Sequence, residues 1–60
     1  SAEGKLIIIL ITAAQSIEAL EALEDRVYQK SVWRTLGEDA KAAINAAFET
    51  RRAALAAALP

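Results

Sequence analysis

The chain has 60 residues, with 7 basic and 8 acidic side chains, and it contains no cysteine and no histidine. A chain this short forms at most one domain, residues 1–60, and buries only about 60% of the surface that its unfolded form exposes, so we expect marginal stability. The missing cysteines exclude disulfides and thiolate metal sites, and the missing histidines remove the commonest general base. Small domains usually rely on disulfides, a metal or a partner chain. The composition therefore points to oligomerisation or to very good packing.

The most informative segment is residues 5–12, K-L-I-I-I-L-I-T. A continuous apolar run of this length is typical of a strand buried on both faces, and it also fits a turn or two of buried helix. The charges that follow favour the strand. Acids precede bases between Ser16 and Thr35, which is the order that suits a helix beginning near Ser16. Residues 13–15 argue the other way, because they are better helix formers than loop formers.

Two helices are predicted after this segment. The first covers residues 16–35, with Ser16 as its N-cap, and its apolar stripe shifts sideways near Val27, which predicts two contact patches. The second covers residues 38–59. The turn between them lies at Gly37, which we expect either in the left-handed conformation that ends a helix or within a capping box for the next one.

The predicted fold class is α+β and helix-dominated: a βαα protomer whose N-terminal strands pair between subunits, with the helices covering the sheet. A strand at residues 5–12 needs a hydrogen-bonded neighbour, and the rest of the chain offers no second strand. The missing strand would come from another copy. The alternative is an all-α oligomer of helical hairpins, in which the apolar first turns overhang the hairpin and again need burial against another copy.

Both interpretations predict a homo-oligomer. Burying the six leucine and isoleucine side chains of the run is worth on the order of 10 kcal/mol, similar to the whole stability of a small domain. The predicted oligomer interface consists of Leu6, Ile7, Ile8, Ile9, Leu10, Ile11, Ile44, Phe48 and Leu55. The competing possibilities are a monomer that hides the run imperfectly and a fragment of a larger protein.

No catalytic, cofactor-binding or metal-binding residues are predicted. Nucleophile–histidine pairs are impossible here, and the two glycines, Gly4 and Gly37, form no phosphate-binding loop. The acidic residues of the first helix are interpreted as a solvated face rather than a weak cation site: Glu18, Glu21, Glu24 and Asp25. Trp33 is either an exposed binding anchor or a cap on the core. Arg51 either pairs with Glu21 or Glu24 of another chain or lays its stem over the core.

The order strand, helix, helix in a short dimer is similar to the ribbon-helix-helix family of DNA-binding proteins. That family presents polar side chains on the outer face of its strand, whereas both faces of residues 5–12 are apolar here. The near-neutral charge balance also argues against DNA, because DNA affinity depends largely on phosphate neutralisation. The run is far shorter than the roughly 20 residues of a membrane span. Nucleic acid, membrane and small-molecule ligands are therefore not predicted partners.

The predicted function is a self-associating structural protein without enzymatic activity. Alanine-rich helices that lack methionine, cysteine and histidine suggest a designed homo-oligomer. The alternative is a small protein-binding module whose apolar N-terminal segment docks on a different protein.

Overall fold

The computed structural model describes residues 2–59, and within that range the chain forms four helices and no strand. The helices are α1 (Ala2–Ala13), α2 (Ile17–Val27), α3 (Lys30–Trp33) and α4 (Glu38–Ala57). The prediction of an α+β protomer with an N-terminal strand is therefore wrong. Residues 5–12 are helical, as in the all-α alternative.

The helical state of α1 has a clear physical reason. Gly4, Ile7 and Ile11 are buried at helical spacing, and Ala14 continues the same stripe just beyond the helix. Isoleucine lowers helix propensity only slightly, and a helix satisfies its own backbone groups. The neighbouring strand that the sequence argument required from another copy is thus unnecessary.

The N-terminus of α2 confirms the predicted cap. The Ser16 hydroxyl accepts a hydrogen bond from the backbone N–H of Ala19 at 3.1 Å, which satisfies one of the free donors of the first turn. α2 then ends at Val27 instead of continuing to Thr35.

The break after α2 lies where the apolar stripe shifts sideways. Gln29 adopts an extended conformation (φ −62°, ψ 139°) before the single turn of α3. In an unbroken helix Arg26 and Lys30 would be like charges one turn apart, which is unfavourable. The extended residue removes that pairing and redirects the chain so that Leu36, beyond α3, is buried in the core.

Gly37 serves as the N-cap of α4 with φ −72° and ψ 163°. Both earlier expectations for this residue are corrected. Its φ is negative, so it is not a left-handed terminator, and the Thr35 hydroxyl donates back to the carbonyl oxygen of Val32 at 2.6 Å rather than forming a capping box. The chain still turns here, because the extended Gly37 separates α3 from α4.

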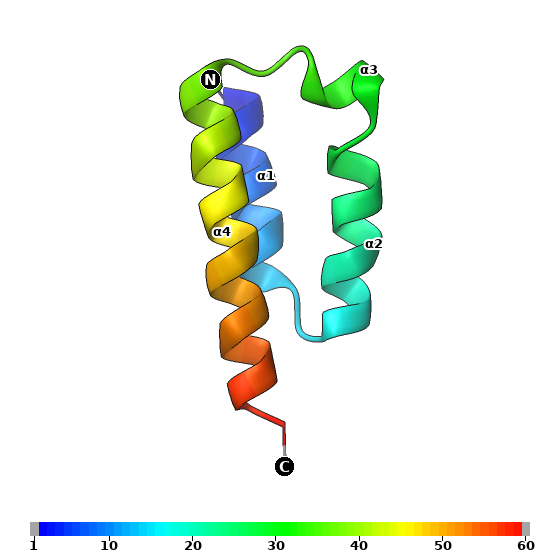
Figure 1. The fold of residues 1–60 in the computed structure, drawn as a ribbon, viewed down its shortest axis with the longest axis vertical. Coiled ribbons are helices and arrows are strands. Elements are labelled where there is room, and N and C mark those ends of the chain that lie inside the picture. The colour runs from blue at the N-terminus through cyan, green and yellow to red at the C-terminus, as the bar shows by residue number, and fades with distance from the viewer. Residues whose placement is uncertain (1, 60) are drawn as a thin grey trace.

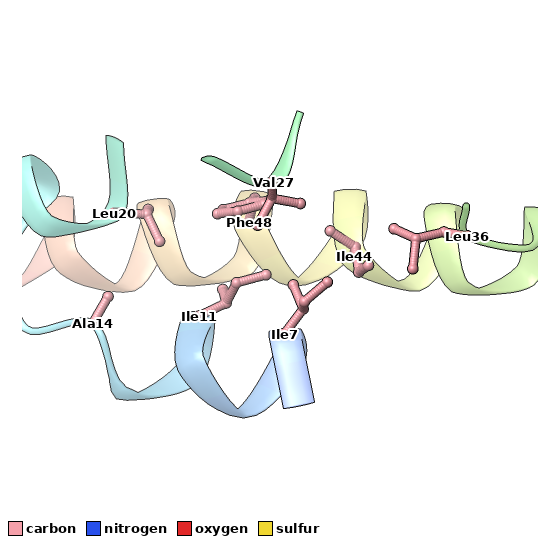
Figure 2. Packing of buried hydrophobic residues seen from close by; sticks show 8 residues of the cluster. All are labelled: Ile7, Ile11, Ala14, Leu20, Val27, Leu36, Ile44 and Phe48. Atoms are coloured by element: carbon pink, nitrogen blue, oxygen red, sulfur yellow. The ribbon is translucent and has the colours of Figure 1, made fainter. Parts of the chain in front are cut away.

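The longest helix, α4, organises the fold, with α1 and α2 packed against it and only slight contact between α1 and α2 (Figure 1). The molecule is elongated, 38 × 17 × 14 Å. Side chains from α1, α2, α4 and the connections meet in one core (Figure 2), namely Ile7, Ile11, Ala14, Leu20, Val27, Leu36, Ile44 and Phe48. Because α1 and α2 both pack against α4 and make little contact with each other, the side of α1 away from α4 is left uncovered.

Candidate interaction surface

The uncovered side of α1 carries large aliphatic side chains. Leu6, Ile9 and Leu10 are 56%, 62% and 48% exposed. Together with the exposed alanines at either end they form what we call the α1 outer face: Ala2, Leu6, Ile9, Leu10 and Ala13. These positions recur at helical spacing and hold no charge. A contiguous exposed apolar surface of this kind marks an interaction site more often than ordinary protein surface does.

A groove of about 380 Å³ adjoins this face between α1 and α2. Leu6 and Leu10 form its α1 wall, and Leu23 and Val27 form part of its α2 wall. Further along, alanines of both helices continue the hollow beside Leu10. The outer face and the groove are therefore continuous, because Leu6 and Leu10 belong to both.

Two charged residues also line the groove, Glu3 from α1 and Arg26 from α2. Neither forms an ion pair with any residue in the range 2–59. Arg26 also lines the second hollow together with Leu10 and Ala13, so it lies near the C-terminal half of α1. Glu3 lies in the first turn of α1, toward the opposite end of the groove.

The predicted interface residues separate into two groups. Six of them face the interior of a single chain: Ile7, Ile11, Ile44 and Phe48 are buried, and Ile8 and Leu55 are partly buried against them. The other three, Leu6, Ile9 and Leu10, are exposed. Packing against α4 covers Ile7 and Ile11 within a single chain (Figure 2), so a solitary copy does not expose the whole apolar run.

Arg51 holds the end of α1 against α4. Its Nε and Nη2 donate to the carbonyl oxygen of Ala14 at 2.8 and 2.6 Å. The last turn of α1 contains no basic residue, so Arg51 brings a positive charge from another helix to a negative helix end. The sequence indicated no such role, because the contact depends on how α1 and α4 are aligned.

The ion pair predicted between Arg51 and the acids of α2 is formed by Arg52 instead, and within one chain. Arg52 forms a charge-assisted hydrogen bond with Glu24, and its Nη1 lies 3.7 Å from Oε2 of Glu21. This network joins α2 to α4. Two of the four clustered acids are thereby engaged in fixing the fold.

The aromatic residues form an intramolecular cluster near the turn. The ring of Tyr28 lies 4.7 Å from that of Trp33 and 5.5 Å from that of Phe48, in tilted geometries. The Tyr28 hydroxyl donates to Oδ1 of Asn45 at 2.5 Å. Burial, with a smaller contribution from the charge of Glu24, raises the pKa of Tyr28. Trp33 is partly buried and packs against the core, so it covers the core near the turn, the second of its two predicted roles.

Within the part of the chain that the structure describes, no group of three or more acidic, cysteine or histidine residues could hold a metal ion. None of the helices within residues 2–59 combines the length and apolar character that crossing a bilayer requires. The α1 outer face and its groove are the strongest candidate for function.

Comparison of the chain with protein-family models, with curated proteins and with solved structures finds no match. The geometry of the α1 outer face is therefore the basis for proposing a function.

Proposed function

We propose that this protein is a structural unit without enzymatic activity, whose copies associate with one another through the α1 outer face. The observation that carries the proposal is the exposure of Leu6, Ile9 and Leu10 on one side of a helix whose opposite side forms the core. Large apolar side chains grouped on an exposed helix face mark a site of contact with another molecule.

The magnitude of burial supports this association. Fully burying a leucine or isoleucine is worth about 1.5–3 kcal/mol. Three side chains that are each about half exposed therefore offer roughly 3–4 kcal/mol per copy, or twice that in a dimer. Association costs an estimated 4–15 kcal/mol in lost translational and rotational freedom. The α1 outer face thus suits a dimer that forms at moderate to high concentration rather than one of extreme affinity.

The total accessible surface of the chain also supports self-association. A compact monomer of this mass, 6.4 kDa, is expected to expose about 3,800 Å². The chain exposes 4267 Å², which is about 500 Å² more than that scaling gives. The excess is consistent with a protomer that has surface still to bury.

The direct test is a mass measurement by light scattering coupled to size exclusion, over a concentration series. We expect the mean mass of the wild type to rise from one chain toward two as concentration increases. Ile9→Lys should remain a monomer and keep its helical circular dichroism, because Ile9 lies outside the core. Ala53→Lys, an equally drastic change at an exposed position of α4, is the matched control and should associate like the wild type.

A folded wild type that stays monomeric from micromolar to millimolar concentration would overturn the proposal. That outcome would leave the alternative function, a module whose apolar face docks on a different protein. Unchanged association of Ile9→Lys would also overturn the proposal, because it would place the contact elsewhere on the molecule.

A further inference from the structure

Four of the five positions of the α1 outer face are symmetric in side-chain size about the middle of the helix. Read along the helix, they are small, large, large and small: Ala2, Leu6, Ile9 and Ala13. The fifth, Leu10, lies beside this row and lines the groove. When two such helices lie antiparallel, Leu6 of one copy meets Ile9 of the other and Ala2 meets Ala13. The large side chains then fill the centre, and the alanines let the two backbones approach at the ends. This match is what a two-fold interface requires, since the same patch must complement itself.

The groove charges distinguish the antiparallel from the parallel arrangement. In an antiparallel pair, Glu3 of one copy lies at the level of the partner's Thr12. Thr12 is within one helical turn of Leu10, and Leu10 lines the groove together with Arg26 of the same copy. Glu3 of one copy therefore comes near Arg26 of the other. In a parallel pair, Glu3 would instead lie beside the partner's Glu3. Because neither Glu3 nor Arg26 has an ion-pair partner among residues 2–59, only the antiparallel arrangement gives each a complementary charge.

The two-fold axis of the dimer doubles the number of these charge contacts. Each Glu3–Arg26 contact occurs twice in the dimer, once at each end of the interface. The groove is open beside Leu6 and Leu10, so the partner's α1 can also reach the apolar walls contributed by α2. The interface then combines an apolar centre with charged ends, which is the usual organisation of a specific protein contact.

We propose that two copies of this chain pair through antiparallel α1 helices about a two-fold axis, with each α1 covering the mouth of the partner's α1–α2 groove and Glu3 of each copy facing the partner's Arg26. This inference rests on the proposed self-association and specifies its geometry.

Disulfide trapping tests the orientation directly, because the chain has no cysteine of its own. The variants are Ala2→Cys and Ala13→Cys, both at exposed alanines, where the change in size is small. In the antiparallel pair Ala2 of one copy lies against Ala13 of the other, whereas the two Ala2 residues are separated by about 16 Å along the helix axis. A disulfide requires Cα atoms within about 7 Å of each other. Oxidising an equimolar mixture should therefore give the mixed disulfide dimer, and oxidising either variant alone should give little.

The control and the opposing results are defined in the same experiment. Ala53→Cys, on the exposed side of α4, measures the rate of crosslinking by random collision. Efficient crosslinking of Ala2→Cys with itself would mean a parallel pair and would overturn the antiparallel geometry, while leaving self-association intact. The antiparallel geometry would also be overturned if light scattering shows a dimer but no combination of Ala2→Cys and Ala13→Cys crosslinks faster than Ala53→Cys. A monomer by light scattering would overturn both proposals.

Charge reversal gives an independent test of the predicted Glu3–Arg26 contact. Glu3→Arg and Arg26→Glu should each weaken dimerisation by roughly tenfold, because each creates two like-charge contacts in a two-fold dimer. The double variant restores opposite charges and should recover most of the wild-type dissociation constant. The effects of the single variants should shrink at high salt, since exposed charges are screened. A double variant no tighter than the weaker single variant would overturn the assigned contact.

Discussion

The guanidinium group of Arg51, in the C-terminal half of α4, donates two hydrogen bonds to the carbonyl oxygen of Ala14, the last residue of the α1 stripe. Ala14 is buried and follows the end of α1. A carbonyl at that position has no further helical turn to donate to it. Arg51 therefore supplies the donors that the end of the helix lacks, and it fixes the alignment of α1 on α4.

Removing this guanidinium should destabilise the fold strongly. Arg51→Met keeps most of the aliphatic stem and loses both hydrogen bonds, so we expect the free energy of unfolding to fall by about 1.5–3 kcal/mol, as for other hydrogen bonds to charged groups. Arg51→Lys should be intermediate, because an ammonium group cannot reproduce the two-pronged geometry. Arg34→Met, at an exposed position, is the control and should change stability little. Denaturant titration measures all three, and equal midpoints for Arg51→Met and Arg34→Met would contradict the assigned role.

Two isoleucines of α1 should respond differently to the same substitution. Ile11 is fully buried, whereas Ile9 is 62% exposed. Ile11→Ala should cost about 2–5 kcal/mol at any protein concentration, because it leaves a cavity in the core. Ile9→Ala should change the stability of the dilute monomer by less than about 0.5 kcal/mol.

At concentrations where the wild type associates, the loss from Ile9→Ala should grow, because association stabilises the folded state by an amount that rises with the logarithm of concentration above the dissociation constant. Thermal melts at low and high protein concentration measure this difference. A loss from Ile9→Ala that is as large as that from Ile11→Ala in dilute solution would mean that Ile9 belongs to the core.

Local signals in the sequence predicted some of the fold correctly. The Ser16 cap and the start of α4 after Gly37 depend on a few neighbouring residues, and both are present. The strand predicted at residues 5–12 was wrong. The charge order beyond Ser16 fits a helix that begins there but does not exclude a separate helix before it, and a helix closes its own hydrogen bonds where a lone strand leaves them unpaired. Once the segment is known to be helical, the spacing of its apolar residues separates buried Ile7 from exposed Ile9.

Other features depend on tertiary alignment and had no local signal. The roles predicted for Arg51 were an ion pair with another chain or a stem laid over the core, but its acceptor, Ala14, is 37 positions away along the chain. The partner of Glu24 proved to be Arg52, one residue along from the expected arginine. A shift of one residue in α4 moves a side chain by about 100° around the helix, so these contacts follow from packing and not from sequence spacing.

Tyr28 should ionise above its ordinary pKa of about 10. Burial raises the pKa of this phenol, and the carboxylate of Glu24 adds to the effect. Because the folded pKa exceeds the unfolded one, the neutral phenol stabilises the fold fully below about pH 10, and this contribution disappears as pH rises through the folded pKa. Ionisation also removes the donor of the hydrogen bond to Asn45.

Tyrosinate absorbance reports this ionisation without overlap from other tyrosines, because the chain has a single one. The midpoint should be higher in native protein than in protein unfolded by denaturant. Tyr28→Phe should lose less stability than the wild type between neutral and strongly alkaline pH. Coincident native and denatured midpoints would contradict the partial burial of the phenol.

Gly37 offers a stabilising substitution that also tests its backbone conformation. Its φ of −72° suits any residue, and a Cβ atom added there meets nothing within 4 Å. As the N-cap of α4, Gly37 provides no side-chain acceptor for the first turn. Gly37→Ser should provide one and also reduce the freedom of the unfolded chain, raising the free energy of unfolding by about 0.5–1 kcal/mol.

Gly37→Ala is the matched control, because it removes the same backbone freedom without adding an acceptor. We expect it to be nearly neutral, since alanine is a poorer N-cap than glycine and this offsets the entropic gain. A left-handed Gly37 would instead make both substitutions destabilising, because any Cβ atom is strained at positive φ. The extended cap predicts the highest denaturant midpoint for Gly37→Ser, with Gly37→Ala and the wild type below it in either order. A wild type more stable than both variants would contradict the extended cap.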